Sequence, residues 1–164
     1  STELALVDCG PSIGISFGAS LGLRRRLSDW FQLGLTVLLP IGATRWETAR
    51  GTALIRQGMG TGEGELTFLH GGWGRLGAAV GAGYYRLEAD GLLNPPLTST
   101  SDSVNGFIAT TGLRAEARVF RQVAIVGAAT AALRMPRAGV AIGTTRIALR
   151  EPLLSFSTGL AVSF

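Results

Sequence analysis

The alternation of apolar with small or polar residues constrains the fold of this chain more than any other feature. Between Ile13 and Leu23, apolar side chains take every second position, and Gly or Ser takes the positions between them. The same period of two runs from Phe31 to Ile41 and from Leu154 to Phe164. Because successive side chains of a strand point to opposite faces, each segment is predicted to be a strand with one oily face.

Further strands and turns follow the same pattern. Strands are also predicted at residues 62–70, 76–85, 107–119, 123–133 and 140–149, the last with a bulge near Thr144, where the phase of the alternation changes. Short turns are predicted at His70–Gly74 and Arg121–Gln122. Residues 44–60 and 88–104 lose the alternation and contain Gly, Pro or charged residues, so they are predicted to be long polar loops.

The size of the residues on the two faces indicates which face is inside. In a soluble barrel or sandwich the bulky face packs inward, and the other face carries charged residues toward water. Here the second face is mostly Gly, Ser, Thr and Ala, and only 16% of the chain is charged. Small residues fit the crowded interior of a narrow barrel, so the large ones are expected to face lipid. The sequence predicts an all-β fold, a closed antiparallel up-and-down transmembrane β-barrel of about eight strands, in one domain over residues 1–164.

With this pattern the chain resembles the small bacterial outer-membrane β-barrel families of the OmpA transmembrane domain, OmpX and OmpW. The final residues 160–164 are similar to the C-terminal assembly signal of these families, in which a terminal Phe follows alternating apolar residues. The resemblance implies that Leu160, Val162 and Phe164 form this signal. It also implies a location in the bacterial outer membrane, contact with outer-membrane lipids, and the barrel-insertion machinery as a transient partner.

The expected strands depart from these families in one respect. Family members have short periplasmic turns and long external loops, whereas eight strands as predicted here place both termini and the loops 44–60 and 88–104 on the same side. Either this protein inverts the rule, or residues 134–151 form one long external loop and Thr2–Cys9 is a separate first strand. The sequence leaves both arrangements open.

Charged residues on the inward face of the predicted strands indicate an internal ion-pair network. The alternation directs five charged side chains into the lumen: Glu63, Glu65, Arg114, Glu116 and Arg118. An unpaired charge is costly in a narrow interior, so these groups are expected to pair. The network is interpreted as a plug that fills the interior, and the alternative is a gated or conducting pore.

Aromatic and basic residues near the strand ends are placed to meet the membrane surface. Trp30, Trp46, Trp73 and Tyr84, with Tyr85 and Phe164, are predicted to form an interfacial aromatic girdle. The run Arg24–Arg26, followed by Asp29, forms a polar turn that could contact lipid phosphates. The alternative is a solvated hairpin end.

Residues that catalysis or metal binding requires are sparse. Cys9 is the only cysteine and His70 the only histidine, and no nucleophile motif accompanies His70. The 15 basic residues are all Arg and are interspersed with 11 acidic residues, so a nucleic-acid footprint is not expected. The longest apolar stretches, Phe31–Ala43 and Val123–Leu133, are shorter than the roughly 20 residues of a spanning helix. We therefore expect no enzymatic activity, metal, cofactor or nucleic-acid partner.

The function that fits these features best is a structural or surface-interaction role in the outer membrane. Loops 44–60 and 88–104 would be the contact regions, because loops of a rigid scaffold carry most binding functions. A narrow porin-like pore for small or apolar solutes is an alternative, supported by the Gly-rich strand 76–85. A soluble lipocalin-like ligand-binding barrel is another alternative. Self-association through the Ala/Gly-rich outer strip of residues 123–133 is a further hypothesis.

Overall fold

The computed structural model is all-β. It describes residues 2–8, 15–48, 51–93, 101–136, 139–142, 145–148 and 152–162, and no helix in these ranges has the length and hydropathy of a membrane span. The strands in chain order are β1 (Thr2–Asp8), β2 (Ile15–Arg26), β3 (Phe31–Pro40), β4 (Thr44–Thr48), β5 (Gly51–Gly71), β6 (Gly74–Leu93), β7 (Ser101–Arg118), β8 (Val123–Met135), β9 (Gly139–Ile142), β10 (Thr145–Ala148) and β11 (Leu153–Val162).

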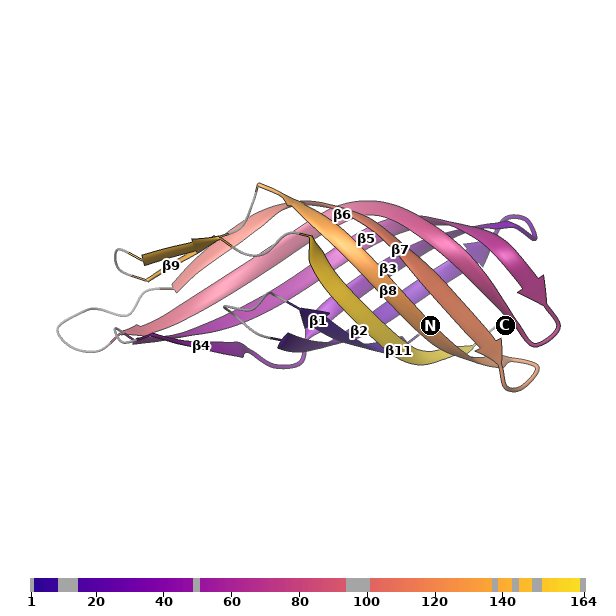
Figure 1. Cartoon of the computed structure of the whole chain (residues 1–164), viewed down its shortest axis with the longest axis horizontal. Coiled ribbons are helices and arrows are strands. Elements are labelled where there is room, and N and C mark those ends of the chain that lie inside the picture. The colour runs from indigo at the N-terminus through magenta and orange to yellow at the C-terminus, as the bar shows by residue number, and fades with distance from the viewer. Residues whose placement is uncertain are drawn as a thin grey trace.

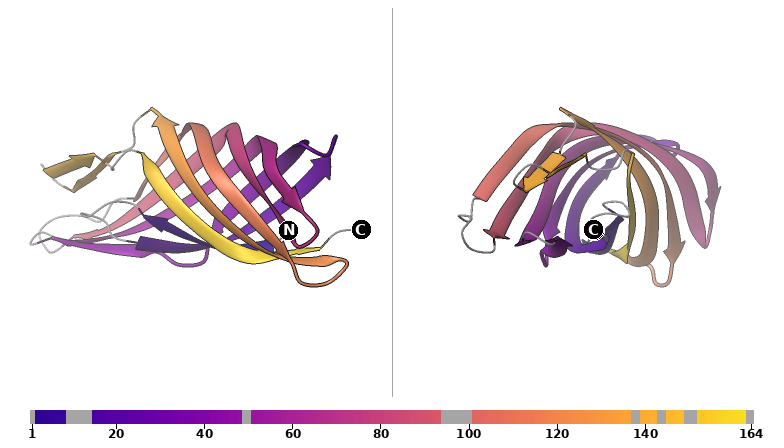
Figure 2. Two further views of the ribbon diagram at one scale, coloured as in Figure 1. Left: turned by 45° about the vertical axis from the view of Figure 1, so that its right-hand side comes forward. Right: turned by 60° about the vertical axis from the view of Figure 1, so that its left-hand side comes forward.

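Most of these strands pair in one antiparallel sheet that curves around a common axis (Figures 1 and 2). Its order is β3-β2-β1-β11-β8-β7-β6-β5-β4, and β3 also pairs with β5. At one junction Leu4 of β1 lies opposite both Ala19 and Thr158, and at the other Val37 lies opposite Gly60. Strands β1, β2, β3, β5, β6, β7, β8 and β11 therefore each have a partner on both sides. The antiparallel up-and-down arrangement predicted from the sequence is confirmed.

The two ends of this sheet differ. One end, called the turn end below, carries the short connections at residues 27–30, 72–73 and 119–122, together with the start of β1 and the end of β11. The opposite end, called the loop end, carries β4, the far halves of β5, β6 and β7, and the separate pair β9 and β10 (Figure 1). The predicted turns at His70–Gly74 and Arg121–Gln122 are confirmed, since both lie between paired strands.

The predicted long loops 44–60 and 88–104 are wrong for most of their length. β4 pairs with β5, and β5, β6 and β7 continue in register as far as the pairs of Gly51 with Leu93 and of Asp90 with Ser101. The alternation is still present there, but with the apolar face turned inward. Ile55 and Leu87 are buried, whereas Arg56 and Arg86 are exposed. Because the apolar face is the inner one here, these strands lack the oily outer face on which the sequence prediction rested.

The predicted seventh strand at 140–149 is also wrong. β9 and β10 pair only with each other among the described residues, as a two-stranded sheet apart from the large one. The expected bulge near Thr144 lies outside the described residues, and the change of phase arises because β9 and β10 are two strands of one hairpin. The missing member of the large sheet is β1, so the arrangement with a separate first strand at residues 2–9 is the correct one, and both termini lie opposite the long connections.

The two faces of the sheet have the side chains that the alternation predicts. On β2 and β3, Leu21, Leu23 and Leu35 are exposed on the outer face, while Ser20 and Gln32 are buried on the inner face. On β7, residues 107, 109, 111, 113, 115 and 117 are exposed, and the residues between them are buried or half-buried. The outer face therefore carries large apolar residues, and the inner face carries small and polar ones between the turn end and the middle of the strands.

Candidate functional site

The middle of the interior is crossed by an ion-pair cluster centred on Arg24. The guanidinium of Arg24 on β2 donates a hydrogen bond of 2.9 Å to Glu63 and another of 3.2 Å to Glu65, both on β5. The Arg24 side chain is 12% exposed and that of Glu65 only 1%. Thr61 donates a further hydrogen bond of 3.0 Å to Glu63. One cation thus holds two carboxylates that would otherwise repel each other.

Glycines make room for these long side chains. Gly34 on β3 lies in register between Arg24 and Glu63, and a Cβ at Gly34 would lie 3.0 Å from a guanidinium nitrogen of Arg24. A Cβ at Gly77 on β6 would lie 2.8 Å from a carboxylate oxygen of Glu65. A Cβ at Gly81 would approach the carbonyl of Gly62 to 2.7 Å and Cγ of Glu63 to 2.9 Å. Gly34, Gly77 and Gly81 therefore accommodate charged side chains in the interior.

A second cluster lies closer to the turn end. Arg75 on β6 donates two hydrogen bonds of 2.7 Å to the carboxylate of Glu116 on β7, a bidentate geometry that gives a strong ion pair. Arg114 lies 3.3 Å from the same carboxylate, and its side chain is 4% exposed. Glu116 therefore lies between two guanidinium groups, one on its own strand and one on the neighbouring strand.

The structure brings together most, but not all, of the residues predicted for the lumen. Glu63 and Glu65 pair with Arg24 rather than with the arginines of β7, and Arg118 is exposed at the turn end. Arg24 and Arg75 were not predicted for the interior. Both continue the inward alternation of their strands, Arg24 after Ser20 and Gly22, and Arg75 before Gly77. Following the alternation into the strand ends would have identified them.

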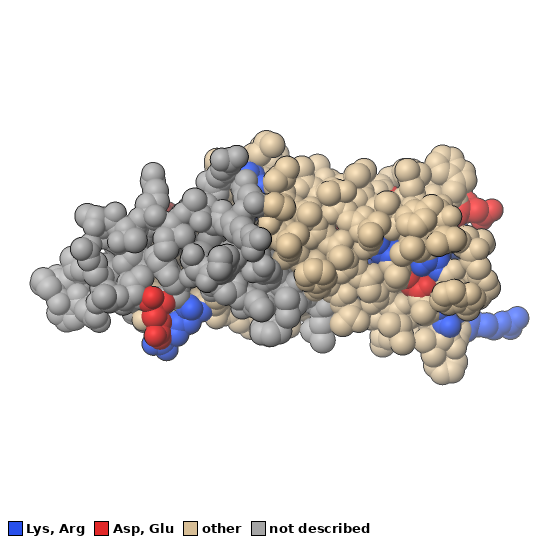
Figure 3. All heavy atoms as spheres, in the orientation of Figure 1, with Lys and Arg blue, Asp and Glu red and all other residues tan. Residues whose placement is uncertain are grey.

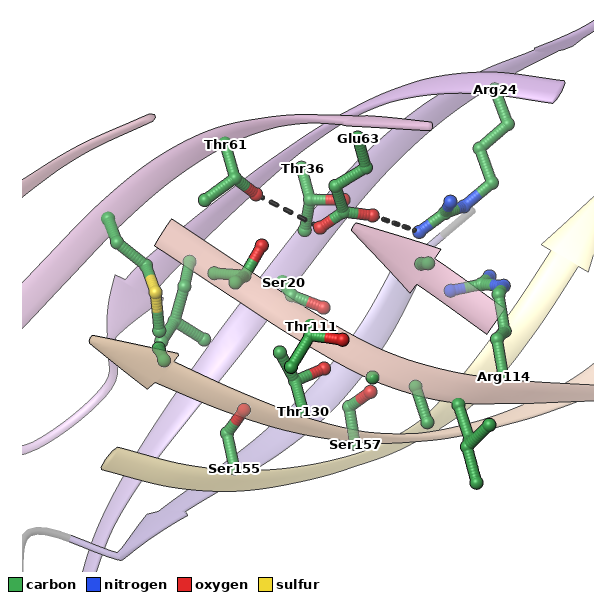
Figure 4. A pocket seen from close by; sticks show the side chains of 18 residues that line it. Ser20, Arg24, Thr36, Thr61, Glu63, Thr111, Arg114, Thr130, Ser155 and Ser157 are labelled. Atoms are coloured by element: carbon green, nitrogen blue, oxygen red, sulfur yellow. Dashed lines mark hydrogen bonds and ion pairs between the residues drawn. The ribbon is translucent and has the colours of Figure 1, made fainter. Parts of the chain in front are cut away.

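A small cavity lies beside the first cluster, on its loop-end side (Figure 4). Its volume is about 80 Å³. Its lining mixes apolar with polar side chains, and hydroxyl groups come from several strands: Ser20, Thr36, Thr61, Thr130, Ser155 and Ser157. Arg24 and Arg114 form its wall toward the turn end. A polar space of this size holds a few water molecules rather than a larger ligand.

A larger cavity opens at the turn end. Its volume is about 560 Å³, and it shares Arg24 and Arg114 with the small cavity. Its other basic residues are Arg26, Arg75, Arg118 and Arg121, and Glu116 is the only carboxylate among its described lining residues. This cavity is called the arginine mouth below. Sequence reasoning missed it because these arginines come from four separate segments.

The loop end of the interior is filled by apolar side chains. Tyr85, Leu87, Ile108 and Leu153 are buried in one cluster with Leu38 and Ile55. The Tyr85 hydroxyl donates a hydrogen bond of 2.7 Å to the carbonyl of Pro136. Buried apolar residues exclude water, so this cluster separates the small cavity from the loop end.

The remaining predicted residues lie on the outside. Trp30 and Trp73 are exposed at the turn end, Tyr84 is exposed on β6 toward the loop end, and Leu160 and Val162 are exposed on β11. Trp46 is on β4, at the loop end and away from the other tryptophans. The side chain of Trp46 and the whole of Phe164 lie outside the described residues. Tyr85, predicted for the girdle, is buried in the interior instead, because it is the inward neighbour of Tyr84.

His70 is exposed at the end of β5 and lines the arginine mouth. Within the described part of the chain, no group of three or more His, Cys, Asp or Glu residues is arranged to hold a metal ion. Arg25 and Arg26 are exposed at the end of β2. Of the run Arg24–Arg26, therefore, only Arg24 contributes to the interior ion pairs.

The fold is similar to that of solved outer-membrane proteins, whereas no protein-family model and no curated protein sequence matches the chain. One similar structure is that of Ail, the attachment invasion locus protein of Yersinia pestis, in complex with the heparin analogue sucrose octasulfate. The match has a TM-score of 0.56 and 12% sequence identity, and it covers 99% of this chain and 94% of the Ail chain. A second structure of Ail matches with a TM-score of 0.54 and 12% identity, covering 99% and 93%. The chain thus has the fold of the small outer-membrane β-barrels to which Ail belongs.

Proposed function

We propose that the eight strands close into a barrel that spans the bacterial outer membrane and has a non-enzymatic, surface-contact role at its loop end. Pairing of β1 with both β2 and β11, and of β3 with β5, supports closure. A membrane-spanning sheet must close because lipid offers no partner for the backbone groups of an open edge. The turn end would face the periplasm and the loop end the exterior.

The observation that carries this proposal is a sharp change of chemistry along the outer face. Tyr84, Phe107 and Met135 lie in register across β6, β7 and β8, and all are exposed. On the turn side of this row the outward residues of β6 are apolar as far as the turn at Gly74, about ten residues, which is the length that a tilted strand needs to cross the hydrocarbon core. On the loop side the next outward residue is Arg86. On the one face that Figure 3 shows, the described surface in the middle has few charged atoms, and most of them lie toward the two ends.

The exposed arginines of β4, β5 and β6 at the loop end are paired with carboxylates. Arg45 lies 2.7 Å from Glu47, Arg86 lies 2.8 Å from Glu88, and Arg56 lies 3.6 Å from Asp90. Ail was crystallised with a heparin analogue, a polyanion. Here the loop-end arginines of β4, β5 and β6 are each paired with a carboxylate, which favours contact with a polar, uncharged surface over recognition of a polyanion.

The filled interior favours a plugged barrel over a pore. The apolar cluster around Tyr85 and Leu87 occupies the loop end, and the ion pairs of Arg24 and Arg75 cross the rest. Gly77 and Gly81, two glycines of the strand that from the sequence supported a pore, lie against Glu65 and Glu63 rather than against open space.

Labelling of single cysteines in whole cells tests the orientation. Ser103 is exposed at the loop end, and Ser28 lies in a turn at the turn end. In a background carrying Cys9→Ser, Ser103→Cys is expected to react with a membrane-impermeant maleimide on intact cells, whereas Ser28→Cys should react only after the outer membrane is opened. Equal reaction of both cysteines on intact cells would contradict the orientation.

Attachment assays test the contact role. Cells that express the wild-type chain are compared with cells that express Arg56→Ser/Arg86→Ser, for attachment to one another and to glycan-coated and protein-coated surfaces. The loop-end variant is expected to reduce attachment to the surface that the wild type binds. Arg25→Ser, at the turn end, is the control and should attach like the wild type. If the wild type attaches no better than cells without the protein, the contact role is wrong.

A further inference from the structure

The arginine mouth at the turn end has no role in contact at the loop end. It is a cavity of about 560 Å³, within the range of small-ligand sites. We propose that the arginine mouth is a binding site for a phosphate-bearing anion, either a lipid headgroup of the inner leaflet or free phosphate. The site differs from the loop-end surface in position, in charge and in the residues that form it.

The charge balance of the mouth carries the proposal. Six arginines line it: Arg24, Arg26, Arg75, Arg114, Arg118 and Arg121. Carboxylates hold three of these arginines: Glu116 in the lining pairs with Arg75 and Arg114, and Glu63 and Glu65 behind it pair with Arg24. Among the described side chains, six guanidinium groups therefore face three carboxylates. An anion in the cavity would reduce the repulsion among the excess cations.

The position of the arginines divides the mouth into a fixed floor and an open rim. Arg75 and Arg114 are held by Glu116 and are mostly buried, so their guanidinium groups are positioned before any ligand arrives. Arg26, Arg118 and Arg121 are exposed at the ends of β2 and β7 and in the turn that follows β7. No carboxylate of the described residues forms an ion pair with these three rim arginines within 4.0 Å.

Guanidinium chemistry favours phosphate as the anion. The planar fork of donors on Arg matches the oxygens of a phosphate in bidentate hydrogen bonds, and Arg stays charged at every physiological pH. All 15 basic residues of this chain are Arg, which gives the mouth donors of this one geometry. In the proposed orientation the mouth opens at the level of the phospholipid headgroups of the periplasmic leaflet, where phosphate groups are concentrated.

Calorimetric titration of the purified protein in a non-ionic detergent tests the site. The ionic strength is held constant with chloride, and two probes are used in separate arms: inorganic phosphate and dihexanoyl phosphatidic acid, a soluble lipid phosphate. Saturable one-site binding is expected in at least one arm. Similar affinities for the two probes would show that the phosphate group alone is enough for binding. Much tighter binding of the lipid would show that the site recognises a lipid headgroup.

Two matched variants make the test specific. Arg118→Gln/Arg121→Gln removes two rim charges and is expected to weaken binding about tenfold or more. Arg45→Gln/Arg56→Gln removes two exposed arginines at the loop end and should change the affinity less than about twofold. All samples are checked for heat-modifiable migration on gels, so that a misfolded variant is recognised. Absence of saturable binding in both arms, or equal weakening by the loop-end variant, would overturn the proposal. Neither result would bear on membrane insertion, which is measured separately.

Discussion

Arg24 and Glu63 form their ion pair across the backbone of Gly34, which lies directly opposite each of them in the register of β2, β3 and β5. Because Gly34 has no side chain, the guanidinium of Arg24 on β2 can reach across β3 to the carboxylate of Glu63 on β5. The same guanidinium also holds Glu65. This cross-link ties three consecutive strands together in the middle of the interior.

Arg24→Met should destabilise the barrel by about 3 kcal/mol or more, because it leaves two carboxylates facing each other in a poorly solvated interior. Arg25→Met is the matched control. Arg25 is the next residue but is exposed on the outside, and its replacement should change the free energy of unfolding by less than about 0.5 kcal/mol. Urea unfolding of the protein refolded into lipid vesicles measures both values. Equal losses in the two variants would show that the cluster does not stabilise the fold.

Gly77→Ala should destabilise the protein by about 1–3 kcal/mol, because the added methyl group would lie 2.8 Å from the Glu65 carboxylate and 2.9 Å from the carbonyl of Leu66. The backbone carbonyl cannot move aside as a flexible side chain would. Gly127→Ala on β8 is the control, since a Cβ there meets no heavy atom within 4 Å. Gly127→Ala is expected to be neutral or slightly stabilising in the same unfolding assay. A neutral Gly77→Ala would mean that β6 can separate from β5 without cost.

Leu35→Arg should destabilise the inserted barrel by about 2–4 kcal/mol, since Leu35 lies on the outer face in the middle of β3 and is 62% exposed. Leu27→Arg, in the turn between β2 and β3, should cost less than about 1 kcal/mol, because the penalty falls toward the interface. Unfolding in vesicles compares the two. A water-soluble barrel would tolerate both substitutions equally, so equal small effects contradict the membrane assignment.

The wild-type protein should show no stable single-channel openings in planar bilayers. Tyr85, Leu87, Ile108 and Leu153 are buried together in one cluster at the loop end of the interior, and close-packed apolar side chains exclude water and ions. A porin of known conductance is the positive control, and the detergent alone is the negative one. Resolvable, reproducible openings at constant voltage would favour the pore that the Gly-rich strand suggested.

Phospholipid hydrolysis should be undetectable in the wild type and unchanged in His70→Ala. His70 is exposed at the mouth, and the described residues place no metal-binding cluster around it. Release of fatty acids from mixed micelles measures the activity, with a bacterial phospholipase as the positive control. Activity that disappears in His70→Ala would show that the barrel is an enzyme.

The strands whose outer face is apolar were predicted correctly from the sequence. The prediction failed for the loop-end strand segments, where the apolar face is the inner one. Leu21, Leu35 and Phe156 alternate with small residues, so their strands and faces were correctly predicted. Ile55 and Leu87 also alternate, but with charged residues outside, and two long loops were predicted in place of these strands.

The interior ion pairs were predicted only by residue type. Alternation placed Glu63 and Glu65 on the inner face, but it could not identify Arg24 as their partner. Arg24 and Glu65 are 41 positions apart in the chain. The register of β2, β3 and β5, which forms only on folding, brings them into contact. The arginine mouth is a still later product of the fold, because its cations come from segments that meet only at the rim.

The change from Tyr84 to Arg86 on one continuous strand also limits how the molecule can sit in a bilayer. Sliding the barrel outward would expose apolar side chains below Tyr84 to water, and sliding it inward would pull Arg86 and its neighbours into hydrocarbon. Both movements cost free energy, so the vertical position of the barrel is set by the covalent order of residues along β6 rather than by any anchoring partner.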